Sequence, residues 1–254
     1  QTFLLKDGSL SPDNFTLHYW TGGSDPDINT GEKGVLQNPI FLLALKNSLI
    51  IAGIASVTAA VIGLLFGYAV ARGKNTAMGR LVDQLSFFPY FIPGISLAAI
   101  YITMFAKPVL FIPALYGTIT IIILITVVKE LPFTVKAGGA AMMQIGPELE
   151  EAAVLGGASW FTRFRRLLLP LSRKSLLSAF ILVFIGAMKE MELIIMLVTP
   201  RTETLTTLTF YYVEKGYDQL TNVVLMIIIA IVVAVYALAV KFGKADLTKG
   251  LGGQ

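Results

Sequence analysis

The chain alternates long apolar runs with short polar intervals, and the length of these runs is its most informative feature. A helix needs roughly 20 residues to cross a hydrocarbon core of about 30 Å. The runs that are long enough, and carry few charges, are about 47–70, 85–105, 109–128, 175–198 and 220–240. This pattern predicts an all-α fold, a polytopic membrane bundle with about five transmembrane helices in this chain.

Composition indicates a membrane protein and excludes several kinds of catalytic and metal-binding motif. Hydrophobic residues make up 55% of the 254 residues and charged residues 14%, which lies outside ordinary soluble usage. Cysteine is absent and His18 is the only histidine, which excludes zinc motifs built on two histidines. No phosphate-binding loop of the form GxxxxGKS or GxxxxGKT occurs. The sequence therefore predicts no catalytic residue, no metal site and no cofactor in this chain, and no nucleic-acid partner.

The basic residues predict how the runs are oriented, because short cytoplasmic loops collect lysine and arginine. Thirteen of the twenty fall after the first run, between 129 and 174, or beyond 240. We therefore expect a multi-pass protein of a bacterial-type inner membrane, with residue 1 outside and the C-terminus in the cytoplasm. Residues 1–39 become an extracytoplasmic loop or cap, and residues 40–254 the transmembrane domain.

An external start has a consequence for the parent protein. The chain begins at Gln1 with no signal-peptide pattern before residue 39. We therefore expect an upstream membrane span, fused to this chain or supplied by a separate chain.

The cytoplasmic interval of about 129–174 contains a helix, a glycine turn and a second helix. Pro147 suits the first turn of a helix, and three glutamates follow it at the end where the helix dipole favours negative charge. Gly156 and Gly157 predict the end of that helix, and Ser159 can cap the next one. A basic loop resting on anionic lipid headgroups is the simplest interpretation.

The spacing within this interval favours a more specific interpretation. It resembles the EAA loop of permease subunits of binding-protein-dependent ABC importers, with isoleucine in the family where Leu167 stands here. The matching residues are Glu151, Ala152, Ala153, Gly157, Leu167, Leu169 and Pro170. The resemblance extends over roughly residues 45–240, including FFPYFIPG at 87–94. Within the family the chain most resembles the ferric iron branch, whose relatives serve thiamine, polyamines, sulfate and phosphonates.

The resemblance implies a mechanism and a set of partners. In this family the loop is a coupling helix that docks on a cytoplasmic ATPase, and ATP and magnesium bind to that ATPase. The implied partners are two ATPase subunits, a second permease half (homologous, or the other half of a fused chain), an extracytoplasmic substrate-binding protein and membrane lipid.

Three charged residues within the fourth run are candidates for the translocation path or its gate: Lys189, Glu190 and Glu192. A charge at membrane depth costs on the order of 3 kcal/mol or more unless it is paired or faces water. Lys189 and Glu192 are three residues apart, so on one helix they would share a face and could form a structural ion pair. An ATPase-independent channel, or a membrane-embedded enzyme using these three residues, is the alternative function.

The second run predicts a kinked, pore-lining helix. Pro89, Pro93 and Gly94 interrupt helical hydrogen bonding, and Tyr90 supplies a polar group, although it could equally anchor the chain at the membrane interface. Small residues in the first run, including Gly53, Gly63 and Gly67, predict close helix packing.

Overall fold

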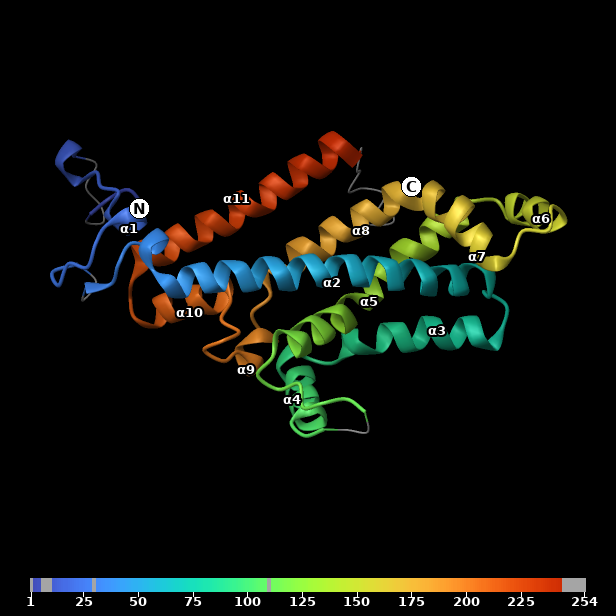
Figure 1. Ribbon diagram of the computed structural model, residues 1–254, viewed down its shortest axis with the longest axis horizontal. Coiled ribbons are helices and arrows are strands. Elements are labelled where there is room, and N and C mark those ends of the chain that lie inside the picture. Colours follow the sequence, from blue (N-terminus) through green and yellow to red (C-terminus); the bar gives the residue numbers. More distant parts are fainter. Residues whose placement is uncertain (1, 6–10, 29–30, 109–110, 244–254) are drawn as a thin grey trace. The chain divides into compact units, whose positions relative to one another are not determined.

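The chain is mainly helical in the part that the structure describes. The structure is a computed structural model that describes residues 2–5, 11–28, 31–108 and 111–243. Helices make up 75% of the structure, and the described residues form no strand beyond an isolated bridge between Leu4 and Phe15, so the predicted fold class is confirmed. The elements are η1 (Pro12–Asn14), α1 (His18–Thr21), η3 (Val35–Gln37), α2 (Pro39–Arg72), α3 (Ala77–Phe87), η4 (Phe88–Phe91), α4 (Gly94–Phe105), α5 (Ile119–Met143), α6 (Pro147–Leu155), α7 (Trp160–Arg163), η5 (Phe164–Leu168), α8 (Leu169–Lys189), α9 (Ile194–Leu197), α10 (Leu205–Glu214) and α11 (Asp218–Gly243) (Figure 1).

Three helices of the described chain are long and apolar enough to cross a membrane. They are α2, the continuous helix Trp160–Lys189 that joins α7, η5 and α8, and Asp218–Lys241 of α11. A fourth span results if α3 with η4 and α4 count as one broken span. The sequence predicts about five spans, whereas the described chain has three, or up to four, helices that qualify by length and composition.

The predicted boundaries are wrong in the second and third runs. Residues 85–105 do not form one kinked helix: α3 passes into the short η4, the chain is extended at Ile92, and α4 begins at Gly94. Proline lacks the amide that continues a helix and disfavours helical geometry in the residue before it. The third run is also displaced: residues 111–118 are not helical, and the helix α5 begins only at Ile119 and continues to Met143, through Lys129 and Lys136.

The fourth run also begins and ends elsewhere than predicted. Its helix starts before residue 175 and stops at Lys189, so the expected span of 175–198 is shifted toward the N-terminus. Residues 190–193 are not helical, and the short α9 follows. An apolar run shows where side chains are hydrophobic, but it does not show where a helix begins or ends.

The Cα positions divide the chain into two compact units. Unit 1 comprises Gln1–Ile51, Ala98–Ile122 and Met188–Ala234, and unit 2 comprises Ala52–Leu97, Ile123–Ala187 and Val235–Gln254. The division into residues 1–39 and 40–254 stays a prediction.

In unit 1, polar side chains hold the loop before α10 against the start of α2. Asn47 Nδ2 donates to the carbonyl oxygens of Arg201 (3.1 Å) and Glu203 (2.8 Å), and the Leu205 amide donates to Ser48 Oγ (2.9 Å). Asn38 Nδ2 donates to the buried Tyr212 hydroxyl at 3.1 Å. Burial, with a smaller effect from the charge of Glu32, raises the pKa of Tyr212 to about 12.

In unit 2, α2 and α5 approach each other backbone to backbone. A Cβ at Gly63 would overlap Thr134, and one at Gly67 would overlap the backbone of Gly138 and Gly139. The expected close packing is therefore confirmed at these two glycines. It is wrong at Gly53, where a Cβ would meet nothing within 4 Å.

Candidate coupling loop and path residues

The predicted helix, glycine turn and helix are present in unit 2. Pro147 occupies the first turn of α6, and Gly157 has φ +78° just after its end. The amide of Ala158 donates to the Ala153 carbonyl (2.9 Å), and the amide of Gly157 donates to the Val154 carbonyl (2.8 Å). These two bonds form a Schellman motif, which favours glycine at the left-handed position. The turn chemistry therefore explains why the chain reverses here.

The second helix of the loop begins with a side-chain cap and continues into the membrane helix. Ser159 Oγ accepts from the Thr162 amide at 3.3 Å, as the sequence predicts for a capping serine. The π-helical segment η5 then joins α7 to α8. The segments α7, η5 and α8 therefore form one continuous helix, Trp160–Lys189.

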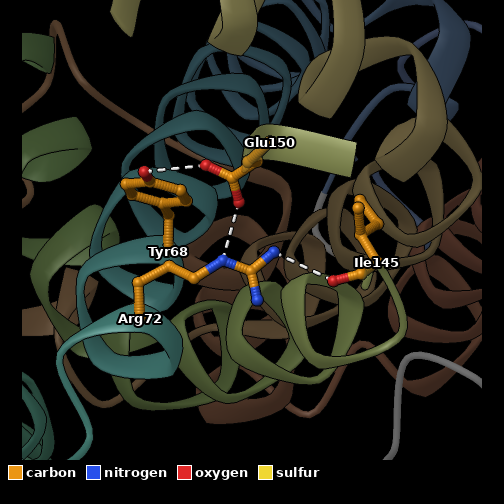
Figure 2. A network of polar contacts seen from close by, with 4 residues as sticks. All are labelled: Tyr68, Arg72, Ile145 and Glu150. Atoms are coloured by element: carbon orange, nitrogen blue, oxygen red, sulfur yellow. Dashed lines mark hydrogen bonds and ion pairs between the residues drawn. The ribbon is translucent and has the colours of Figure 1, made fainter. Parts of the chain in front are cut away.

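A buried carboxylate fixes α6 to the end of α2. Glu150 Oε1 pairs with Arg72 Nε at 2.7 Å, and its Oε2 accepts from the Tyr68 hydroxyl at 3.0 Å. Arg72 Nη2 donates to the Ile145 carbonyl at 2.9 Å, just before α6 (Figure 2). Glu150 is the buried residue of α6, with 7% of its surface exposed. Charge-assisted bonds of this kind are stronger than neutral ones, so they hold α6 in one orientation.

A groove of about 500 Å³ lies beside this anchor. Its lining residues come from α2, α6 and α7, and they are Tyr68, Arg72, Pro147, Glu150, Glu151, Val154, Leu155 and Arg163. Leu155 is 90% exposed and Val154 is also exposed, so this part of the surface offers apolar contacts next to charged ones.

The structure exposes much of the predicted motif rather than packing it within unit 2. Glu151, Ala152 and Gly157 are exposed and Ala153 is half-buried. Leu167 and Leu169 are half-buried, and Pro170 is exposed in the first turn of α8.

Sequence reasoning missed the anchor and emphasised its neighbour. From the sequence, Glu150 is only a favourable charge in the first turn of the helix, whereas in the structure it is the residue that holds α6 in place. Its partners Tyr68 and Arg72 lie 82 and 78 residues away in the sequence. The sequence offers only a weak signal: an arginine at the end of an apolar run needs an acidic partner when it is partly buried.

The three charged candidates at the end of α8 lie differently from the prediction. Lys189 is the last residue of α8, and Glu192 lies in the following turn, so the two do not share a helix face. Both are exposed, and the described residues include no ion pair between them. Glu190 Oε1 instead accepts from the Leu193 amide (3.1 Å), and its carbonyl accepts from Thr206 Oγ1 (2.9 Å). Glu190 therefore stabilises the turn that ends the helix.

Tyr90 and Pro93 mark the break between α3 and α4. Tyr90 is exposed in η4, and its ring meets that of Phe133 edge to face at 5.8 Å. Pro93 is exposed, and its carbonyl accepts from the Leu97 amide at 2.9 Å in the first turn of α4. A role of either residue in a translocation path stays a prediction.

Similarity to known proteins decides the family. Residues 43–245 match the family described as "Binding-protein-dependent transport system inner membrane component". The chain belongs to this family. This permease is accordingly a multi-pass inner-membrane transport subunit. Among the described residues, no group of three or more His, Cys, Asp or Glu side chains could hold a metal ion, and the cofactor assignment stays a prediction.

Curated relatives of the permease include proteins with different cargoes in their names. It is 33% identical over 198 residues to the ferric transport system permease protein FbpB of Actinobacillus pleuropneumoniae, covering 73% of this chain and 28% of that protein. A putative ferric permease FbpB 1 of Haemophilus influenzae is 36% identical over 160 residues, covering 63% and 24%. The maltose/maltodextrin permease MalG of Vibrio vulnificus is 32% identical over 188 residues, covering 72% and 62%. The permease thus spans about a quarter of the length of the two ferric proteins.

Solved structures with the same fold belong to ABC transporters. A bacterial alginate ABC transporter in complex with its pentasaccharide-bound periplasmic protein contains a chain with a TM-score of 0.67 and 20% identity, covering 84% of this chain and 82% of that one. A chain of the MetNI methionine ABC transporter in an inward-facing conformation gives a TM-score of 0.65 and 20% identity, covering 81% and 97%. At this identity the likeness shows the fold.

Proposed function

We propose that this permease forms half of the translocation path of an ATP-driven importer and receives work from a cytoplasmic ATPase through α6. Its partners are two ATPase subunits, which hold ATP and magnesium, a second permease half and an extracytoplasmic substrate-binding protein. Substrate delivered by the binding protein crosses between the permease halves when the ATPases close and reopen. Residue 1 lies outside and the C-terminus in the cytoplasm.

This proposal rests on one observation: one side of α6 is anchored to α2, and the other side is exposed. Glu150 holds it to Arg72 and Tyr68, whereas Glu151, Ala152 and Leu155 are exposed. A helix that only covered the cytoplasmic end of the bundle would bury its apolar side chains against α2. Here the polar residue is buried and the apolar residues face outward, as expected of a surface that is completed by a partner.

The anchor also provides a route for force. An ATPase bound to the exposed part of α6 pushes on a helix that is tied to α2 by a partly buried ion pair and to α8 through α7 and η5. Glu151 offers a carboxylate to a basic group or backbone amides of the ATPase, and the alanines allow close approach. Movement of the ATPase therefore displaces two membrane helices together.

For the cargo, we propose ferric iron, delivered by the binding protein and carried through as substrate. The two ferric relatives support this choice, and the maltose relatives make a sugar the competing outcome. The cognate binding protein, purified with its ligand, distinguishes the two: metal analysis finds iron, or mass spectrometry finds a sugar instead.

Two adjacent glycines provide the sharpest test of coupling. Gly157→Ala places a side chain at φ +78°, which costs roughly 1–2 kcal/mol and distorts the end of α6. Gly156→Ala is the matched control, because Gly156 has φ −76° and its Cβ would meet only ordinary contacts. In proteoliposomes with the ATPase and binding protein, Gly157→Ala should lose most ATP-driven uptake while Gly156→Ala retains it.

A second variant separates contact from turn geometry. Glu151→Ala removes an exposed carboxylate and leaves α6 intact, so it should uncouple uptake without loss of membrane insertion. Undiminished uptake in both Glu151→Ala and Gly157→Ala contradicts the coupling assignment. Substrate flux through the permease with no ATPase present supports the alternative channel.

A further inference from the structure

A second hollow lies within unit 1. It has a volume of about 250 Å³ and lies among the end of α8, α10 and the first half of α11. Its apolar lining consists of Met188, Met191, Phe210, Val213, Leu225 and Ile228. An apolar cavity of about 150 Å³ can bind benzene, so a hollow of this size suits a short stretch of hydrocarbon chain.

The polar groups of this hollow are already used, with one exception. Thr206 Oγ1 donates to the Glu190 carbonyl at 2.9 Å, and Thr209 Oγ1 donates to the Leu205 carbonyl at 2.7 Å. Lys189 contributes to the lining, is exposed, and forms no ion pair within the described chain. A ligand that is apolar inside the hollow and negatively charged at Lys189 would suit this lining.

The position of the hollow along α11 matches one leaflet of a membrane. Leu225 and Ile228 follow the first residue of α11, Asp218, by 7 and 10 positions. At a rise of 1.5 Å per residue they lie about 10–15 Å along the helix, which is within half of a 30 Å hydrocarbon core. Their neighbours Met226 and Ile229 are exposed, and only 17% of the apolar window of α11 is buried.

We propose that this hollow, termed the Lys189 pocket, binds an anionic phospholipid, with an acyl chain against Val213 and Leu225 and the phosphate at Lys189. Lysine reaches the membrane interface readily, because its long aliphatic stem can lie along apolar surface while the ammonium meets headgroups. With the proposed topology, the lipid belongs to the outer leaflet.

Lipid retention by the purified full-length protein tests the proposal without transport. Native mass spectrometry compares phosphatidylglycerol with phosphatidylcholine of the same acyl chains. Wild type should retain phosphatidylglycerol about fivefold more strongly, the effect expected of one lysine near the headgroups. Lys189→Gln should abolish this preference. Lys215→Gln is the matched control, because Lys215 is an exposed lysine of unit 1 outside the pocket.

A second substitution tests the apolar part of the pocket. Val213→Phe fills the hollow and should reduce retention of both lipids. If this variant does not fold, Val213→Leu takes its place and should reduce retention to a smaller extent. A preference that persists in Lys189→Gln overturns the proposal. Unchanged lipid retention in both Val213 variants also overturns it. A dimer of the chain that is lost in these variants overturns it as well, because the pocket would then bind a second copy of the chain. Failure of ATPase coupling leaves all of these readouts unaffected.

Discussion

At the scale of single residues, the adjacent glutamates of α6 have opposite surroundings. Glu150 is buried and paired with Arg72, whereas Glu151 is exposed. The two residues are adjacent in α6, so the same substitution can be made at each of them. Its effect at Glu150 reports on the anchoring of α6, and its effect at Glu151 reports on contact with a partner. Composition and charge counting treat the two as equivalent, and only the fold distinguishes them.

We expect Glu150→Gln to loosen α6 from the end of α2. The substitution removes the charge that pairs with Arg72, and bonds to charged groups contribute about 1.5–3 kcal/mol. Amides of α6 should therefore exchange with deuterium roughly ten- to a hundredfold faster, measured by mass spectrometry. Tyr68→Phe removes one neutral donor and should have a smaller effect of the same kind.

Glu151→Gln is the control for this experiment. It changes an exposed carboxylate of the same helix, so exchange in α6 should stay at the wild-type rate. Equal exchange in Glu150→Gln and wild type would show that the ion pair does not hold the helix.

At the scale of elements, glycine decides how closely α2 and α5 approach. Gly138 and Gly139 are neighbours in α5, but a Cβ at Gly138 would overlap the backbone of Gly63 and Leu64, whereas one at Gly139 would meet Gly67 at 3.7 Å. Gly138→Ala should therefore destabilise the protein by about 1–3 kcal/mol through overpacking. Gly139→Ala should be neutral or stabilising, since alanine favours a helix by up to about 1 kcal/mol over glycine.

Thermal unfolding in detergent, followed by loss of helical circular dichroism, measures this difference. Gly53→Ala extends the comparison to α2, because a Cβ there meets nothing within 4 Å. If Gly138→Ala and Gly139→Ala unfold at the same temperature, close packing of α5 does not limit stability.

The elements also show which features the sequence could predict. The turn after α6 follows local rules of proline, glycine and serine placement, and those rules identified Pro147, Gly157 and Ser159 correctly. The anchor at Glu150 depends on partners about 80 residues away, so no local rule contains it. Apolar length located α2 and α11, but it could not separate η4 from α4 or set the start of α5, where prolines and loop geometry determine the backbone.

At the scale of the whole molecule, orientation in the membrane is the feature on which the proposed roles depend. The lysine and arginine distribution predicts that α6 lies in the cytoplasm and that Asp13 and Arg201 lie outside. The chain has no cysteine, so single cysteines can be introduced without removing any native one. Leu155, Arg166, Asp13 and Arg201 are all exposed, which makes each accessible to a maleimide once substituted.

We expect a membrane-impermeant maleimide added to spheroplasts to label Asp13→Cys and Arg201→Cys at once. Leu155→Cys and Arg166→Cys should react only after the membrane is permeabilised, because a charged reagent does not cross the hydrocarbon core. Labelling after permeabilisation is the control for each variant, since it shows that the thiol is accessible. Reaction of Leu155→Cys in intact spheroplasts would place α6 outside, where no cytoplasmic ATPase could reach it, and both the coupling role of α6 and the assignment of the Lys189 pocket to the outer leaflet would have to be abandoned.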